Sequence, residues 1–346
     1  MKNYSNFDIS LPENVLQYRY FINEERKYGK MSKIVIMESL GISAEELAAR
    51  KKPFEEKGHT FACFPRTTDI PTLIEEAKDA DAMIIANMPM PGEVIGSCEN
   101  LKFIDVAFTG VDHVGLAAAK EKGIAVSNAS GYSNEAVSEL VLGMVLNLLR
   151  NMSAVEARCR EGKTFAGLMG SELKGKTVGI IGLGKIGSRS AELFNAFGCR
   201  VLANSRTKKE NAAPYIEQVS KDELLRESDI VVLHCPLNDS TRGMINAEKL
   251  ALMKKSAILI NVARGPVVVA KDLAEALDNG TIAAAGVDVF DKEPPLDLDE
   301  PLLHCKNCLV TPHVAFASEE SMTLRAEIVF DNLDAWMRGE QKNVIL

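Results

Sequence analysis

Three side chains in the second half of the chain could together act on a small organic acid. Arg264, Glu293 and His313 each come shortly after an apolar run of strand type. A guanidinium pairs bidentately with a carboxylate, and an imidazole exchanges protons near neutral pH. A carboxylate beside that imidazole would orient it and favour its protonated form. We therefore expect Arg264 to bind a carboxylate, and His313, held by Glu293, to exchange a proton with the neighbouring oxygen.

A glycine-rich turn is the second chemical signal. Residues 182–187 read Gly-Leu-Gly-Lys-Ile-Gly, after an apolar run and before a helical pattern. In that context the spacing is typical of a dinucleotide-binding loop rather than of a purely structural turn. Gly182 would permit the tight turn, Gly184 would let the backbone approach a pyrophosphate, and Gly187 would let the helix lie close to the sheet. The N-terminus of that helix would bind the phosphates.

The end of the next strand indicates which cofactor is used. An acidic residue there would bind the ribose 2′-hydroxyl of NAD, whereas an arginine would accept the 2′-phosphate of NADP. The chain instead carries Ser205 and Arg206, followed by Lys208 and Lys209. A guanidinium suits a phosphate, so we expect NADP rather than NAD. The alternative is that Arg206 only stacks on adenine and that either cofactor is used.

The two signals together predict a reaction. A strand-end arginine alone is more often part of a surface ion pair, and a lone histidine is more often structural. Beside a nicotinamide cofactor, however, the combination favours hydride transfer between NAD(P)H and a small 2-keto acid. Arg264 would then bind the substrate and polarise its ketone. His313 would act as the acid in reduction and as the base in the reverse direction.

The elements that must position these residues alternate between strands and helices from residue 31 onward. Strands are expected at Ile34–Met37, Ala82–Ala86, Phe103–Ala107, Ile124–Val126, Thr177–Ile181, Arg200–Ala203, Ile230–Leu233, Ala257–Val262, Ala283–Val287 and Cys308–Val310. Helices are expected at Ala44–Lys57, Ile70–Lys78, Lys185–Phe197, Ala247–Lys255, Lys271–Asn279 and Ser318–Met337. This alternation predicts an α/β fold of doubly wound parallel sheets. Ligands bind at the carboxyl ends of such strands, where the three catalytic segments fall.

One further helix is expected between the two alternating series. Its apolar residues repeat at i, i+1, i+4 and i+5 over Ser133–Met152, which gives a broad apolar stripe. Ser133 is the expected N-cap. Packing in the core and contact with a second subunit explain the stripe equally well.

Composition excludes several classes of protein. The 346 residues suffice for two domains, and 46% of them are hydrophobic. The net charge of −8, without a dense basic face, argues against nucleic-acid binding. No apolar run approaches a membrane span, and no signal peptide precedes the fold. The 7 scattered cysteines favour a reducing, cytoplasmic location. His304, Cys305 and Cys308 lack a second ligand pair, so no metal site is expected.

Taken together, these segments resemble the D-isomer-specific 2-hydroxyacid dehydrogenases over about residues 31–346, most closely the glyoxylate and hydroxypyruvate reductases. The motifs are the 182–187 loop, Val262–Gly265, Asp288 through Glu293-Pro294, and Thr311–His313. The resemblance implies two Rossmann-like domains. The cofactor domain, 132–314, would be inserted into a substrate domain formed by 31–131 and 315–346. It also implies a homodimer with the 133–152 helix at its interface.

The resemblance also implies roles for individual residues. Arg264 would bind substrate, His313 would be the acid/base, and Glu293 would be its partner. Cofactor contacts would come from Gly182, Gly184, Lys185, Ile186, Gly187, Ser205, Arg206, Pro236, Thr241, Val262, Ala263, Arg264, Asp288 and His313. The substrate carboxylate would be held by backbone N–H groups in loops containing Met88, Pro89, Thr109, Gly110 and Val111.

Four departures from the family pattern bear on function. Ser205 replaces the acidic residue of NAD-preferring members. Phe316 is expected to narrow the substrate pocket. The absence of a C-terminal regulatory domain fits poorly with the long phosphoglycerate enzymes. Residues 1–30 hold 4 of the 6 tyrosines, and we expect them to form an arm that packs on the same or a neighbouring subunit.

Other functions stay open at this point. A corepressor or redox sensor could use the same fold and cofactor loop, because fold does not fix function. Oxidation of formate or phosphite is a second alternative, although formate-type relatives carry an amide where this chain has Glu293. The side chain of the keto acid is not identified. Glyoxylate or hydroxypyruvate is favoured, because NADP use suits a reductase.

Overall fold

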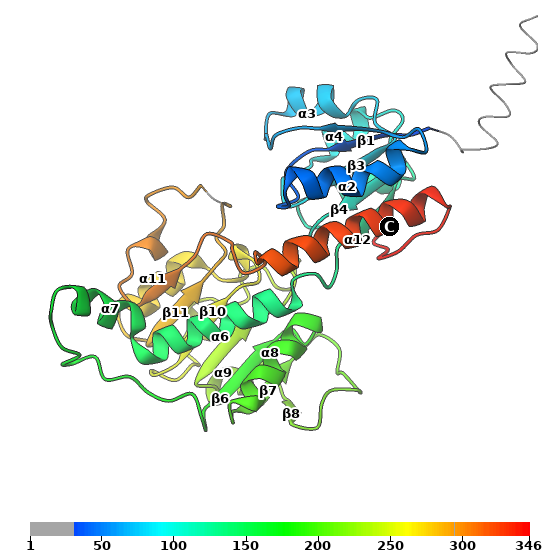
Figure 1. The fold of residues 1–346 in the computed structure, drawn as a ribbon. Coiled ribbons are helices and arrows are strands. Elements are labelled where there is room, and N and C mark those ends of the chain that lie inside the picture. The colour runs from blue at the N-terminus through cyan, green and yellow to red at the C-terminus, as the bar shows by residue number, and fades with distance from the viewer. Residues whose placement is uncertain (1–30, 294) are drawn as a thin grey trace, which may run out of the picture. The chain divides into compact units, whose positions relative to one another are not determined.

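The computed structural model describes residues 31–293 and 295–346, so the expected arm at 1–30 and Pro294 lie outside the described residues. The described chain forms two compact units (Figure 1). Unit 1 consists of residues 31–129 and 326–346, and unit 2 consists of Ser130–Arg325. Unit 2 is therefore inserted in the sequence of unit 1.

Unit 1 is built on a parallel sheet of five strands in the order β2-β1-β3-β4-β5. Its elements are β1 (Lys33–Ile36), α2 (Ala44–Glu55), β2 (Thr60–Cys63), α3 (Ile70–Ala77), β3 (Ala82–Ile85), α4 (Gly92–Ser97), β4 (Phe103–Val106), α5 (Leu116–Glu121), β5 (Ala125–Asn128) and the second part of α12 (Glu319–Met337). The strand order reverses between β1 and β3, which is where ligands bind in doubly wound sheets.

Burial explains why these short segments form a sheet. Every residue of β3 and β4 is buried, as expected for parallel strands covered on both faces. Helix α12 packs onto the unit 1 sheet through aromatic side chains. The Trp336 ring stacks on Phe103 with centroids 5.1 Å apart, and Phe330 lies 5.8 Å from Phe54 of α2.

Unit 2 is built on a parallel sheet of seven strands in the order β12-β11-β10-β9-β6-β7-β8. Its elements are α6 (Asn134–Arg150), α7 (Met152–Arg160), β6 (Thr177–Ile181), α8 (Lys185–Ala196), β7 (Arg200–Asn204), β8 (Ile216–Gln218), α9 (Lys221–Glu227), β9 (Ile230–Leu233), α10 (Ala247–Leu250), β10 (Ile258–Asn261), η1 (Gly265–Val267), α11 (Ala270–Asp278), β11 (Ala284–Val287), η2 (Pro301–Leu303), β12 (Cys308–Val310) and the first part of α12. The strand order reverses between β6 and β9.

Two apolar clusters cover the faces of the unit 2 sheet and make it a three-layer structure. One lies under α6 and α8 and includes Val141, Val145 and Phe194. The other lies under α9, α10 and α11 and includes Leu224 and Leu273. Core packing therefore accounts for the buried part of the α6 stripe. Among the described residues no single helix is long and apolar enough to cross a membrane, and only the pair α6 and α7, bent by 60°, passes that test together.

The structure differs from the sequence-based expectations at several boundaries. The expected 133–152 helix breaks at Asn151, whose φ of +50° ends α6 and starts α7. Ser133 occupies the N-cap position of α6 but makes no capping hydrogen bond. The units divide at 129/130 and 325/326 rather than at 131/132 and 314/315. Residues 315–325 belong to unit 2, and Ala315 packs in the α6–α8 cluster of that unit.

Candidate active site

The glycine loop follows β6 at the point where the strand order reverses. Gly182 has a φ of +105°, which a side chain would strain. A Cβ at Gly182 would also lie 2.6 Å from the backbone of His234 after β9, and one at Gly187 would lie 2.1 Å from the Gly182 carbonyl oxygen. Both glycines are therefore required by close packing. A Cβ at Gly184 would meet no protein atom within 4 Å, so the backbone there is open to a ligand.

A cavity of about 400 Å³ lies beside this loop. Six residues predicted to contact the cofactor line it: Gly182, Gly184, Ser205, Arg206, Pro236 and Thr241. Its walls come from the ends of β6, β7 and β9 and from the start of α9. The fit to a dinucleotide is good, since Gly182 and Gly184, the N-cap residue of the uncapped helix α8, line the same cavity.

The electrostatics of this cavity favour an anion. Its lining includes Arg206, Lys209 and Lys221, whereas none of the described lining residues is Asp or Glu. His234 adds no charge near neutral pH, because burial lowers its pKa to about 4. The side chain of Gln218 exchanges two hydrogen bonds of 2.8 Å with the backbone of Lys209 and so fixes the basic loop. The Ser205 hydroxyl donates to the Thr207 carbonyl within that loop.

The predicted acid/base residues His313 and Glu293 lie at the same edge of the sheet, beyond the ends of β12 and β11. His313 Nδ1 lies 2.6 Å from Glu293 Oε2. A carboxylate only accepts hydrogen bonds, so Nδ1 carries the proton of this hydrogen bond. His313 has a φ of +54°, an uncommon conformation for a residue other than glycine. Such backbone strain is held in place by surrounding contacts.

Asp288 supplies much of that support. It follows β11 and is fully buried. Its carboxylate accepts hydrogen bonds from the Thr311 hydroxyl at 2.5 Å and from the N–H groups of Val314 and Ala315 at 2.9 Å each. Burial raises the pKa of Asp288, and these hydrogen bonds oppose the rise. The observed partners of this carboxylate thus fix the loop that carries His313.

Arg264 follows β10, the neighbour of β11. Its backbone carbonyl accepts a hydrogen bond of 3.1 Å from the Asn261 side chain. The next residue is held very close to the segment after β11, because a Cβ at Gly265 would lie 2.0 Å from the carbonyl carbon of Phe290. This contact fixes the base of the Arg264 turn against that segment.

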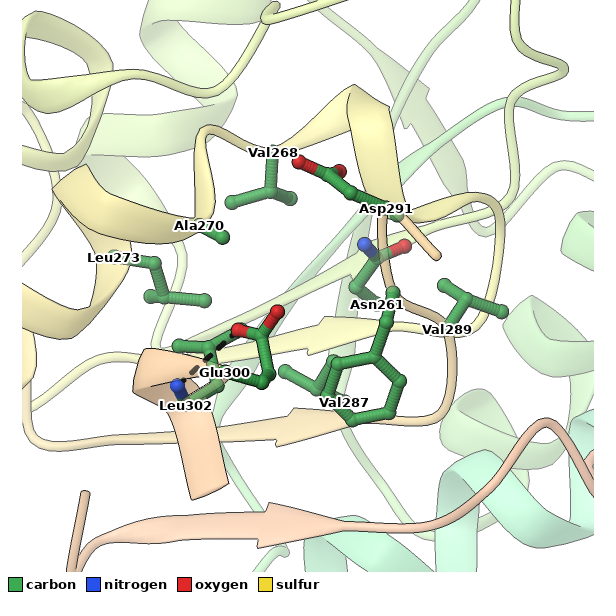
Figure 2. Close-up of a pocket in the computed structure, with 11 residues that line it drawn as sticks. Asn261, Val268, Ala270, Leu273, Val287, Val289, Asp291, Glu300 and Leu302 are labelled. Carbon is green, nitrogen blue, oxygen red and sulfur yellow. Dashed lines mark hydrogen bonds between the residues drawn. The ribbon is translucent and has the colours of Figure 1, made fainter. Parts of the chain in front are cut away.

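Figure 2 shows a small cavity beside that turn, lined in part by Asn261, Val287 and Glu300. Its volume of about 10 Å³ is room for roughly one water molecule. A keto acid does not fit there. This cavity is therefore not a substrate site.

The predicted substrate loops lie together in unit 1. The Met90 N–H donates to the His113 carbonyl, and the His113 ring Nε2 lies 2.8 Å from the Ala86 carbonyl oxygen. The N–H of Met88 is already used, because Glu38 Oε1 accepts it and the Ala86 N–H at 2.8 Å each. Pro89 has no N–H. These two residues therefore shape the loop, and Met88 does not offer its N–H to a substrate here.

The second predicted substrate loop, which contains Thr109, Gly110 and Val111, has a polar side chain that is not used within the fold. The Thr109 hydroxyl is shielded from solvent and makes no hydrogen bond within the described residues. The Thr109 carbonyl accepts a hydrogen bond of 2.7 Å from Asn128, which fixes the backbone next to Gly110 and Val111. A shielded hydroxyl without a partner is unusual in native proteins and calls for an explanation.

Some residues of these sites were not predicted from the sequence. Lys221 was missed because it lies in the first turn of α9, far along the chain from the glycine loop. Glu38 was missed because its partners, the backbone N–H groups of Ala86 and Met88 and the guanidinium of Arg66, lie 28 to 50 residues away in the sequence. Conversely, eight of the predicted cofactor residues do not line the 400 Å³ cavity: Lys185, Ile186, Gly187, Val262, Ala263, Arg264, Asp288 and His313. The first three open α8. The other five follow β10, β11 and β12 at the same edge of the sheet, where the nicotinamide half of a cofactor would extend.

Fold and site thus define a dinucleotide-binding oxidoreductase of Rossmann type. The family model for the NAD binding domain of D-isomer specific 2-hydroxyacid dehydrogenases matches residues 142–315. The chain is 38% identical over 290 residues to a hydroxypyruvate reductase from Blautia hydrogenotrophica, covering 80% of this chain and 88% of that one. It is 36% identical over 276 residues to a glyoxylate reductase from Korarchaeum cryptofilum, covering 78% and 83% of the two chains.

Solved structures agree with these relatives. An acyclic imino acid reductase in complex with NADPH and D-Arg has a TM-score of 0.83 and 27% identity, covering 91% of this chain and 100% of that chain. The chain belongs to the D-isomer specific 2-hydroxyacid dehydrogenase family. The predicted family and the predicted α/β class of two parallel sheets are therefore confirmed.

Proposed function

We propose that this enzyme uses NADPH in preference to NADH to reduce a small 2-keto acid: glyoxylate, which gives achiral glycolate, or hydroxypyruvate, which gives the D-2-hydroxy acid. The observation that carries the proposal is the 2.6 Å pair of His313 and Glu293, at the strand edge that also holds Arg264 and the glycine loop. The bound nicotinamide supplies the hydride. Arg264 binds the keto acid and polarises its carbonyl, and His313 Nε2 gives its proton to the ketone oxygen as the C–H bond forms. Glu293 stabilises the imidazolium before that transfer.

Two further observations support the choice of cofactor and the binding of the substrate carboxylate. The preference for NADPH rests on the three cations and the missing carboxylate in the cavity at the end of β7. The Thr109 hydroxyl, which makes no hydrogen bond among the described residues, is suited to donate a hydrogen bond to the substrate carboxylate. Gly110 and Val111 follow it in the same loop.

Oligomeric state and location belong to the same proposal. We infer a homodimer from the exposed apolar side chains of Met152, Phe165 and Met169, which are 54%, 61% and 83% exposed. All 7 cysteines lie within the described residues and are free thiols, which supports a reducing compartment such as the cytoplasm.

An absorbance assay at 340 nm tests the activity. NADPH and NADH are each supplied with glyoxylate, hydroxypyruvate, pyruvate, 2-ketoisocaproate and phenylpyruvate. Faster oxidation of NADPH with the two smallest polar acids is expected. If the protein binds NADPH but oxidises it with none of the acids, the catalytic proposal is wrong, and a cofactor-sensing role on the same fold takes its place.

A further inference from the structure

A buried arginine lies next to the catalytic histidine and takes no part in the reaction described above. Arg325 belongs to α12 and is 3% exposed. Arginine is almost never fully buried unless its charge is compensated. An apolar side chain of similar volume would fill such a site without the cost of removing a charge from water. The burial of this charged side chain therefore needs an explanation.

Two aromatic rings hold the guanidinium. The Cζ atom of Arg325 lies 5.8 Å from the ring centroid of Tyr132 and 5.8 Å from that of Phe316. Both distances suit cation–π attraction, which is stronger when the groups are shielded from water. The Tyr132 hydroxyl also hydrogen-bonds to Arg325. Burial raises the pKa of Tyr132, so the phenol is a neutral partner.

Phe316 in turn packs against the imidazole of His313. The two ring centroids are 5.5 Å apart with an interplanar angle of 85°. The Phe316 main chain is tied to α12 as well, because its carbonyl accepts a hydrogen bond of 2.5 Å from the Ser321 hydroxyl. Ser321 and Arg325 are four residues apart and lie on one face of the helix. One turn of α12 thus holds both the backbone and the ring of Phe316.

We propose that Arg325 is a positioning residue that acts through Phe316 to fix the imidazole of His313 for proton transfer. The inference rests on the proposed role of His313 as acid/base. The strained backbone of His313 (φ +54°) makes its ring depend on neighbours. Glu293 restrains the His313 ring through its hydrogen bond at Nδ1. Phe316, which is held by Arg325, restrains the same ring through their edge-on contact. Arg325 is too deeply buried to contact a substrate itself.

The test compares Arg325→Met, Arg325→Lys, Phe316→Leu and the double variant Arg325→Met/Phe316→Leu. Arg338→Met, the same change at a half-exposed arginine just beyond α12, is the control. Arg325→Met should lower kcat by about 10- to 100-fold, the cost of a small misplacement of a reacting group, and leave the Kd for NADPH within twofold. Arg325→Lys keeps a cation beside the rings and should recover part of kcat. In the Phe316→Leu background, Arg325→Met should cause no further loss.

A second readout does not depend on activity. The chain has only 5 histidines, so the imidazole C–H region of the NMR spectrum is sparse, and His313→Gln identifies the His313 signal. The ring current of Phe316 makes that signal sensitive to the placement of the two rings. Arg325→Met should move it, and Arg338→Met should not. An unmoved signal, with kcat within twofold of the wild type, would overturn the proposal.

These readouts separate the possible failures. If Arg325→Met does not fold, Arg325→Lys carries the test through the same signal. Additive losses of kcat in the double variant would contradict action through Phe316. If the wild type reduces no keto acid, the proposed function fails, while movement of the His313 signal still decides whether Arg325 positions that ring.

Discussion

At the scale of single residues, the His313–Glu293 pair concentrates the proposed proton chemistry in two side chains. His313→Gln keeps a polar side chain of similar size but cannot deliver a proton. We expect kcat to fall by about 10²- to 10⁴-fold, with the Kd for NADPH unchanged, because the phosphate-binding loop follows a different strand. Steady-state rates and fluorescence titration of NADPH measure the two quantities. His304→Gln, in an exposed loop, is the matched control, and near-normal turnover of His313→Gln would refute the assignment.

The cations near the end of β7 should decide between the two cofactors. Arg206→Ala and Lys221→Met each remove a charge that a 2′-phosphate would contact, and NADH has no such phosphate. We expect the Kd for NADPH to rise about tenfold in each variant, the equivalent of a hydrogen bond to a charged group. The Kd for NADH should stay within twofold. Lys208→Met tests whether any lysine of the loop matters, since Lys208 does not line the cavity. Equal losses for both cofactors would remove the 2′-phosphate role.

At the scale of elements, the turn from β6 to α8 separates packing from ligand binding. Gly187→Ala places a methyl group 2.1 Å from the Gly182 carbonyl oxygen, so we expect a loss of stability of about 1–3 kcal/mol. Gly184→Ala meets no protein atom within 4 Å. It should leave the Tm unchanged and weaken cofactor binding. Thermal unfolding with and without NADPH measures both effects, and a large loss of Tm in Gly184→Ala would contradict this division.

A buried carboxyl group in β4 makes the stability of unit 1 depend on pH. Asp105 is fully buried, accepts one hydrogen bond of 3.0 Å from Asn332 of α12, and has one oxygen without a partner among the described residues. Burial raises its pKa from 3.8 to about 8. The folded state therefore binds a proton that the unfolded state has lost between these pH values. The free energy of unfolding should fall as pH rises from about 4 to 8 and then level off.

Asp105→Asn removes this titration and keeps the size of the protonated side chain. At pH 8 we expect the variant to be more stable than the wild type by more than about 1 kcal/mol. The difference should shrink as pH falls towards 4. Denaturant unfolding at both pH values is the measurement. A difference that does not change with pH would show that Asp105 stays ionised in the folded protein.

Most elements could be predicted because each carries its own pattern. Runs such as Ile230–Leu233 are continuously apolar, and the glycine spacing marks the turn after β6. The missed strands β2 and β8 lie at sheet edges and are partly exposed, so they lack such runs. The expected helix Ala247–Lys255 is regular only over Ala247–Leu250. The roles of Lys221, Glu38 and Arg325 arise from contacts between distant segments, which no local pattern reports.

At the scale of the whole molecule, one exposed region of unit 2 should decide the oligomeric state. Helix α7 has no buried residue, and Phe165 and Met169 follow it with their side chains mostly exposed. We expect sedimentation to give a mass of twice 37.7 kDa, and Phe165→Glu/Met169→Glu to give a monomer. Leu298→Glu, which alters an 86% exposed leucine elsewhere in unit 2, should leave the dimer intact. A monomeric wild type at micromolar concentration would refute the dimer.

The contact between Tyr132 and Arg325 also brings together the two places where the chain enters and leaves unit 2. Tyr132 is the third residue of that unit, and Arg325 is its last. A module whose two ends lie close together can be inserted into a host fold, or removed from it, without distorting the module or the host. Excised as residues 130–325, unit 2 would need only a short linker to close into a ring, and new termini opened in one of its surface loops would yield a circular permutant. The side chains proposed to position His313 would then also join the two ends of a transferable cofactor-binding module.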